Sequence, residues 1–109
     1  MGLDQYAFAR KEGQEDVKLM QWRKHANLEG WMANLYHNRG GAGDFNCVDL
    51  KLREEDLDRL QEEYQSLETA RGFFWGESHP DDDVDTQEFI RLAYKHLNNG
   101  WTIIYTSWW

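Results

Sequence analysis

Two periods of hydrophobic residues alternate along this chain of 109 residues. Apolar side chains at every second position predict a strand, and apolar side chains three or four positions apart predict a helix. In residues 2–9 the odd-numbered side chains share one face of a predicted strand, and Tyr6 and Phe8 share the other. Four further strands are predicted, at residues 17–22, 44–52, 72–76 and 101–109.

The helical period appears in three segments. In the first, the apolar positions from Leu28 to Tyr36 form one face, and Asn27 is placed to cap the free amides of the first turn. Glu29 lies in that turn, where its charge suits the helix dipole. The other two helices are predicted at residues 53–67 and 86–97.

These elements predict a single α+β domain over residues 1–109, in the order ββαβαβαβ. About five strands are expected to form one mixed or mostly antiparallel sheet, with the three helices over one face. The last strand combines β-branched residues with large aromatic ones, so we expect it at or near the centre of the sheet.

The composition limits the partners, because 20 Asp and Glu against 12 Lys and Arg give a net charge of -8. Proteins that bind nucleic-acid phosphates present clustered cations, and the pair Arg23–Lys24 is no such cluster. The sequence therefore predicts no nucleic-acid partner and no binding to anionic membranes. No apolar run approaches the roughly 20 residues that span a bilayer, and a single cysteine suits a reducing cytoplasm, where we expect the protein to act.

The stretch WRKHANLEGWM, residues 22–32, holds the strongest candidates for chemistry. His25 and Glu29 are four residues apart, which suits an acid–base pair, and the helix start beside two cations could hold an anion. The interpretation that we favour is structural: His25 precedes the helix and Glu29 complements its dipole. No metal-ligand spacing is present, so no metal and no cofactor are expected. The candidates for binding a ligand or partner in this region are Arg23, Lys24, His25, Asn27, Glu29 and His37.

Three other features are interpreted structurally. Cys47 lies on a predicted strand without a partner histidine, so we expect a buried, inert thiol. Residues 79–85 hold four aspartates but lack the central glycine of a calcium loop, and Asp85 with Glu88 is expected to cap the third helix. The glycines of NRGGAGDFN follow a helix and precede a strand, the reverse of a phosphate-binding loop, and are expected to end the helix and form a connection that could act as a lid.

Trp108 and Trp109 end the last predicted strand. Neighbouring strand residues point to opposite faces, so both indoles cannot enter one core. One is expected under the helices and the other on the open face of the sheet, where an exposed Trp is typical of binding sites. The exposed indole could form a patch with Tyr6, Phe8, Trp75 and Trp101; the alternative is that oligomerisation or a C-terminal turn hides it.

Four blocks, MGLDQY, WRKHANLEGWM, GFFWG and GWTIIYTSWW, resemble a family of short uncharacterised proteins encoded by tailed phages, including phages of marine cyanobacteria. The resemblance covers nearly the whole chain and implies a protein that acts inside an infected bacterial cell. Some members of that family carry a phosphoglycerate kinase label. Such an enzyme needs two domains and a nucleotide-phosphate loop, so this activity is not expected here.

Two functions remain in competition. The favoured one is a protein-interaction module for a host or phage protein, because the chain has surplus aromatics at its end and no catalytic signature; self-association into a homo-oligomer is also possible. The alternative is a small enzyme or an anion-binding or ligand-binding protein that uses Arg23, His25 and Glu29.

Overall fold

The computed structural model describes residues 2–70 and 75–109 and confirms the α+β class. The described residues form three helices and one sheet of four antiparallel strands, in the order ββαβααβ. The elements are β1 (Asp4–Arg10), β2 (Val17–Arg23), α1 (Ala26–Asn38), β3 (Leu50–Leu52), α2 (Glu54–Glu63), α3 (Asp82–Asn98) and β4 (Thr102–Trp108).

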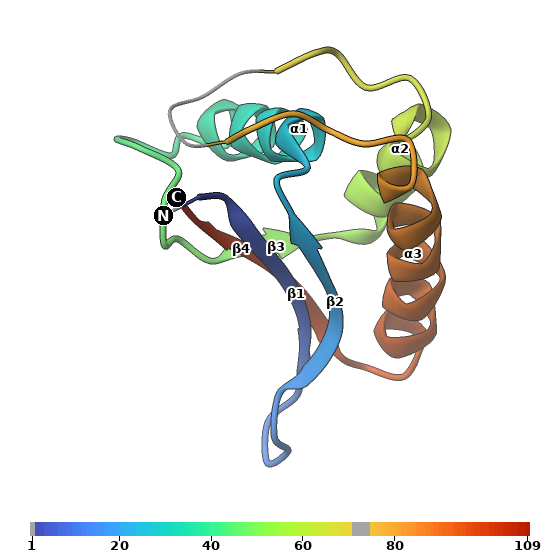
Figure 1. Cartoon of the computed structure of the whole chain (residues 1–109). Coiled ribbons are helices and arrows are strands. Elements are labelled where there is room, and N and C mark those ends of the chain that lie inside the picture. The colour runs from blue at the N-terminus through green and yellow to red at the C-terminus, as the bar shows by residue number, and fades with distance from the viewer. Residues whose placement is uncertain (1, 71–74) are drawn as a thin grey trace.

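The strand order is β2-β1-β4-β3, so the last strand of the chain lies in the middle of the sheet, as predicted. β1 and β4 pair along seven residues each, from Asp4 opposite Trp108 to Arg10 opposite Thr102. All three helices lie on one side of the sheet, α1 across one end and α2 with α3 alongside, and the other face carries no helix (Figure 1).

The core lies between the sheet and the helices and is built around aromatic rings. Trp22 meets Phe89 of α3 edge-on at 5.2 Å between ring centroids and Tyr105 of β4 at 6.1 Å. The indole N–H of Trp22 donates to Thr86 Oγ1 at 3.1 Å, so the one polar atom of this buried ring has a partner. A bulge at Leu19, between the pairs Ala7–Met20 and Phe8–Lys18, lets β2 turn both Leu19 and Trp22 inward, although they are three residues apart.

The strand prediction for residues 44–52 was wrong except at its end, because only Leu50–Leu52 joins the sheet. Cys47 has a φ of 59°, which is incompatible with a strand, and its N–H donates to Ser107 O at 2.7 Å in a turn beside β4. Its thiol is exposed, so the expectation of a buried cysteine was also wrong. The strand predicted at 72–76 falls mainly on residues 71–74, which lie outside the described residues. The observed order differs from the predicted one only by this strand between α2 and α3.

The third helix begins earlier than predicted, at Asp82, so Asp85 lies inside the helix and does not cap it. The N–H of His79 donates to Asp82 Oδ2 at 2.7 Å, which closes the turn just before the helix. Three aspartates therefore occupy the first turn, where their charges face the positive end of the helix dipole. The acidic segment is explained by this helix start.

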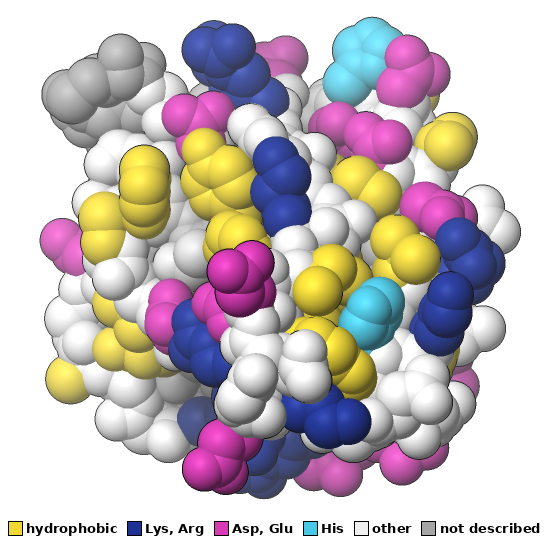
Figure 2. Space-filling model, turned by 90° about the horizontal axis from the view of Figure 1, so that it is seen from below, with side chains coloured by type: hydrophobic (Ala, Val, Ile, Leu, Met, Phe, Trp, Pro, Cys, Tyr) yellow, Lys and Arg dark blue, Asp and Glu magenta, His cyan; other side chains and the backbone are white. Residues whose placement is uncertain are grey.

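The end of the molecule that carries the β1–β2 turn and the C-terminal end of α3 is shown as a surface in Figure 2. Positive and negative side chains are interspersed there with small hydrophobic areas. Lys11 reaches across to donate to Asn99 O at 3.0 Å and lies 5.8 Å from the centre of the Trp101 ring. These contacts hold the end of the hairpin to the start of β4.

Candidate functional site

Glu29, a predicted site residue, lies in the first turn of α1 but points into the core, where its side chain is fully buried. Its carboxylate accepts from the Tyr105 hydroxyl at 2.6 Å and from the Ser107 hydroxyl at 2.8 Å, both on β4. Burial raises the pKa of Glu29 to about 7, although these hydrogen bonds act in the opposite direction. The carboxyl group therefore ties α1 to the central strand.

Gln5 extends this network to the start of α1. Its side-chain amide donates to Tyr105 Oη at 2.9 Å and to the backbone carbonyl of His25 at 3.0 Å, and its carbonyl oxygen accepts from the His25 N–H at 2.9 Å. Sequence reasoning missed Tyr105 and Ser107 as partners of Glu29, and Gln5 as the link from Tyr105 to His25. The available signal was a polar residue at a core-facing strand position, since Gln5 and Ser107 both interrupt apolar faces.

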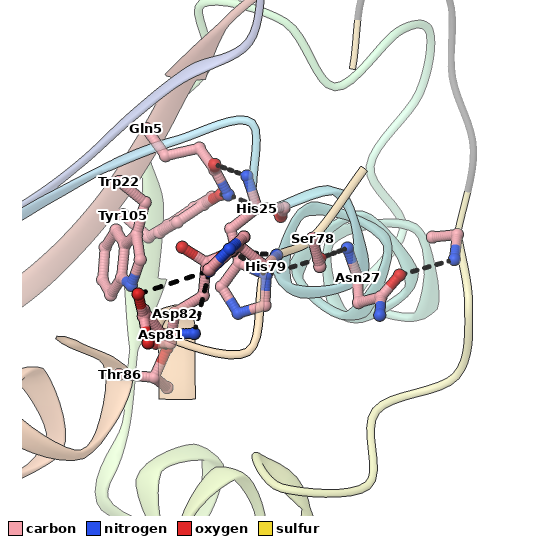
Figure 3. Close-up of polar contacts among 11 residues, drawn as sticks. Gln5, Trp22, His25, Asn27, Ser78, His79, Asp81, Asp82, Thr86 and Tyr105 are labelled. Atoms are coloured by element: carbon pink, nitrogen blue, oxygen red, sulfur yellow. Dashed lines mark hydrogen bonds and ion pairs between the residues drawn. The ribbon is translucent and has the colours of Figure 1, made fainter. Parts of the chain in front are cut away.

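The His25 ring, also buried, meets the loop that leads into α3 (Figure 3). Its Nδ1 lies 2.7 Å from Ser78 Oγ and 3.6 Å from Asp82 Oδ2, and Ser78 Oγ also accepts from the backbone N–H of Asn27 at 2.9 Å. Burial lowers the pKa of His25, and the charge of Asp82 opposes that effect. Serine and aspartate both face the same ring nitrogen, which differs from a catalytic triad, in which they face opposite nitrogens.

Ser78 thus supplies the cap of α1 that was expected from Asn27. The helix begins one residue before Asn27, and the Asn27 side chain instead accepts from the backbone N–H of Ala70 at 3.0 Å. A cap from a distant segment leaves no local spacing pattern in the sequence, which is why the prediction failed.

The structure does not bring the remaining polar candidates to His25 and Glu29. Arg23 has a side chain that is 79% exposed and reaches Asp4 across the open face of the sheet, at 3.7 Å. Lys24 is exposed in the turn before α1, with a φ of 60°. His37 lies near the other end of α1, about 12 Å along the helix axis from Glu29. Its Nδ1 contacts Gly41 O at 3.2 Å.

The hollows lined by described residues include two on the helical side. The first, about 620 Å³, lies between α1 and the segment after α2 and is lined by Asn27, Trp31, Arg59 and Ala70 among others. The second is a groove of about 690 Å³ between α2 and α3. Neither His25 nor Glu29 lines either hollow. Among residues 2–70 and 75–109 no three His, Cys, Asp or Glu side chains are grouped closely enough to hold a metal ion.

The open face of the sheet carries an aromatic cluster of Tyr6, Phe8 and Trp108. Tyr6 is stacked beside Phe8 with ring centroids 6.2 Å apart, and Trp108 lies 5.7 Å from Tyr6 on the neighbouring strand. Trp108 is 55% exposed, which is unusual for so large an apolar side chain. This arrangement follows from the alternation of β1 and β4 and their pairing.

Trp109 points away from the aromatic cluster, as expected for adjacent strand residues. Its indole N–H donates to Phe45 O at 2.9 Å, and its ring meets Trp75 edge-on at 5.7 Å. Trp101 packs against His96. Trp75 and Trp101, expected as members of the patch, therefore lie elsewhere.

Two lysines flank the Phe8 end of the aromatic cluster, one on each side of the β1–β4 pair. Lys18 lies opposite Phe8 on β2, and Lys51 lies opposite Ile104 on β3. Neither forms an ion pair with any residue that the structure describes. Arg10, by contrast, pairs with Asp16 at 3.0 Å and Asp49 at 3.6 Å. This face is less acidic than the molecule as a whole.

None of the described helices is long and apolar enough to cross a membrane. No family model, curated protein or solved structure matches this chain.

Proposed function

We propose that this chain is a protein-interaction module that binds its partner through the open face of the sheet. The observation that carries the proposal is the aromatic cluster: an indole that is 55% exposed, in contact with two further rings on a face without helices. A rigid sheet presents these rings without ordering any loop, and aromatic side chains with few rotamers lose little entropy on binding.

The proposed partner is a protein that offers an apolar side chain ringed by carboxylates. The apolar part would pack on Tyr6 and Trp108, and the carboxylates would face Lys18 and Lys51. Single-stranded nucleic acid also stacks on aromatic rings beside cations. A net charge of -8 would repel a polyanion, and this favours a protein partner.

The resemblance to short tailed-phage proteins supports placing this binding in the cytoplasm of an infected bacterial cell, with a host or phage protein as the partner. The alternative, a small enzyme or ligand-binding protein built on Arg23, His25 and Glu29, has less support because Arg23 lies on the open face while the other two side chains are buried in the core.

The proposal is tested by capture from bacterial lysate with three tagged baits: the wild type, Trp108→Thr and Val17→Thr. Threonine suits a strand, and Val17 is an exposed apolar residue at the start of β2 outside the aromatic cluster, so Val17→Thr controls for loss of an exposed apolar side chain. We expect a protein that the wild type and Val17→Thr both retain and Trp108→Thr does not. Lys18→Glu should weaken the same capture.

Two results would contradict the proposal. One is the absence of any protein that depends on Trp108 while circular dichroism shows all baits folded. The other is capture abolished by nuclease treatment, which would identify a nucleic acid as the bound species.

A further inference from the structure

The groove between α2 and α3, on the opposite side of the sheet from the aromatic cluster, forms a second surface. Its floor and walls include apolar parts of Tyr64, Val84, Ile90 and Tyr94. Its volume of about 690 Å³ lies in the range in which proteins hold ligands, about 300–1,000 Å³. Val84 is 67% exposed, the most exposed large hydrophobic residue of the described chain.

The α3 wall of this groove is acidic, because Asp85 and Glu88 line it. Two exposed acids of α2, Asp58 and Glu62, do not line the groove but lie close to Tyr94, which does. The one cation in the lining, Arg91, is already paired with Glu88, with Nε 3.0 Å from Glu88 Oε2. The groove therefore keeps an excess of negative charge at neutral pH.

The Tyr94 hydroxyl lies close to this negative charge. It hydrogen-bonds Asp58, from α3 to α2. Burial, the hydrogen bond to Asp58 and the charges of Asp58, Glu54 and Glu62 together raise the pKa of Tyr94 to about 12, and burial is the largest cause. The part that comes from the three carboxylates reflects a negative field, which would favour a cation brought into the groove.

We propose that the groove between α2 and α3 binds a cationic amphipathic helix of a partner protein. Two packed helices leave a groove that accepts the apolar face of a third helix, and the anchors of such a helix repeat at three or four residues. Charge complementarity selects the partner: Lys or Arg flanking the apolar stripe would face Asp85 and Glu88 of the α3 wall and the exposed carboxylates of α2 beside the groove. A second copy of this acidic chain would be repelled at long range, which argues against self-association here.

The inference concerns residues other than those of the proposed function, so the two can fail separately. The test measures binding of a labelled synthetic peptide of about 18 residues, long enough for five helical turns, with Leu on one face and Lys on the other. A second peptide carries Glu in place of Lys. Fluorescence anisotropy is recorded with the full chain and with the variants Val84→Thr, Asp85→Asn and Val17→Thr.

We expect the Lys peptide to bind and the Glu peptide not to bind. Val84→Thr should weaken binding about fivefold or more, Asp85→Asn about twofold, and added salt should weaken it further. Val17→Thr is the matched control, because Val17 is an exposed valine on the edge of the sheet and should leave affinity unchanged.

Three outcomes would overturn the inference. Equal binding by all four proteins would show a diffuse electrostatic attraction without a groove site. No binding of the Lys peptide at about millimolar protein would exclude the proposed occupant. A dimer of the free chain in analytical ultracentrifugation that Val84→Thr dissociates would assign the groove to a second copy.

Discussion

Replacing Glu29 with glutamine should make the protein more stable above neutral pH and should leave it nearly unchanged in acid. The wild-type carboxyl is buried and has a pKa of about 7, against an ordinary value of 4.5. Glutamine keeps a carbonyl oxygen for the Tyr105 hydroxyl and offers an N–H to Ser107, so the hydrogen-bonded tie between α1 and β4 can persist without the charge.

The sign follows from proton binding. Below pH 4.5 Glu29 is protonated in both the folded and the unfolded chain, and it adds no pH dependence. Between pH 4.5 and about 7 the unfolded chain releases the proton while the folded chain keeps it, so the free energy of unfolding falls as pH rises. Above about pH 7 both states have released the proton, and the free energy of unfolding falls no further through Glu29. One pKa unit corresponds to about 1.4 kcal/mol, so the full loss is about 3 kcal/mol.

The assay is urea unfolding followed by tryptophan fluorescence, for wild type and Glu29→Gln, at several values between about pH 4 and pH 8. The unfolding free energy of Glu29→Gln minus that of the wild type should rise by about 3 kcal/mol across this range and then level off. The corresponding rise in Tm at pH 8 is about 12 °C for a domain of this size. Glu12→Gln, at an exposed carboxylate in the β1–β2 turn, controls for the substitution itself.

Comparison with the variant is essential because His25 changes the free energy of unfolding with pH in the direction opposite to Glu29. Its pKa is lowered by burial, so protonation of His25 in the unfolded chain below its ordinary pKa of 6.5 destabilises the fold as pH falls. This contribution is common to both proteins and cancels in the difference. A difference that stays flat from acid to neutral pH, or a Glu29→Gln protein that is less stable at pH 8, would refute the reasoning.

Three further outcomes can be checked on purified protein. Ser78→Ala removes the acceptor of the Asn27 N–H and should lower the free energy of unfolding by about 1 kcal/mol in urea titrations, whereas Ser66→Ala, whose hydroxyl contacts only Glu63 O at 3.4 Å on the surface, should change it little. The exposed thiol of Cys47 should react with a thiol-specific chromogenic reagent in the native state as fast as in urea; slow native reaction would mean that the thiol is covered. Gly30→Ala would bring a methyl group within 2.5 Å of the Ala70 side chain and should cost about 1–3 kcal/mol, and unchanged thermal unfolding of this variant would contradict the close packing of α1 on that segment.

The strands at both ends of the chain and the existence of three helices could be predicted because each depends on a local period. The alternation from Leu3 to Ala9 placed Tyr6 and Phe8 together on one face, and the opposite orientation of Trp108 and Trp109 followed from the same geometry. Local patterns failed where a distant segment supplied the partner. The cap of α1 comes from Ser78, and Cys47 turns to meet Ser107 of β4.

Charge and burial of single residues depended on the tertiary structure in the same way. Glu29 satisfies the rule for an acid in the first turn of a helix, yet its carboxyl lies in the core because β4 presents two hydroxyls there. Lys18 and Lys51 are far apart in the sequence. They lie on the same face because β2 and β3 belong to one sheet, on either side of β1 and β4, and the strand register turns both side chains to that face. By itself the sequence determined periodicity, element type and the face on which each strand residue lies. Which faces meet, which stay open and which polar groups pair were decided by packing, since these depend on contacts between residues that no local spacing relates.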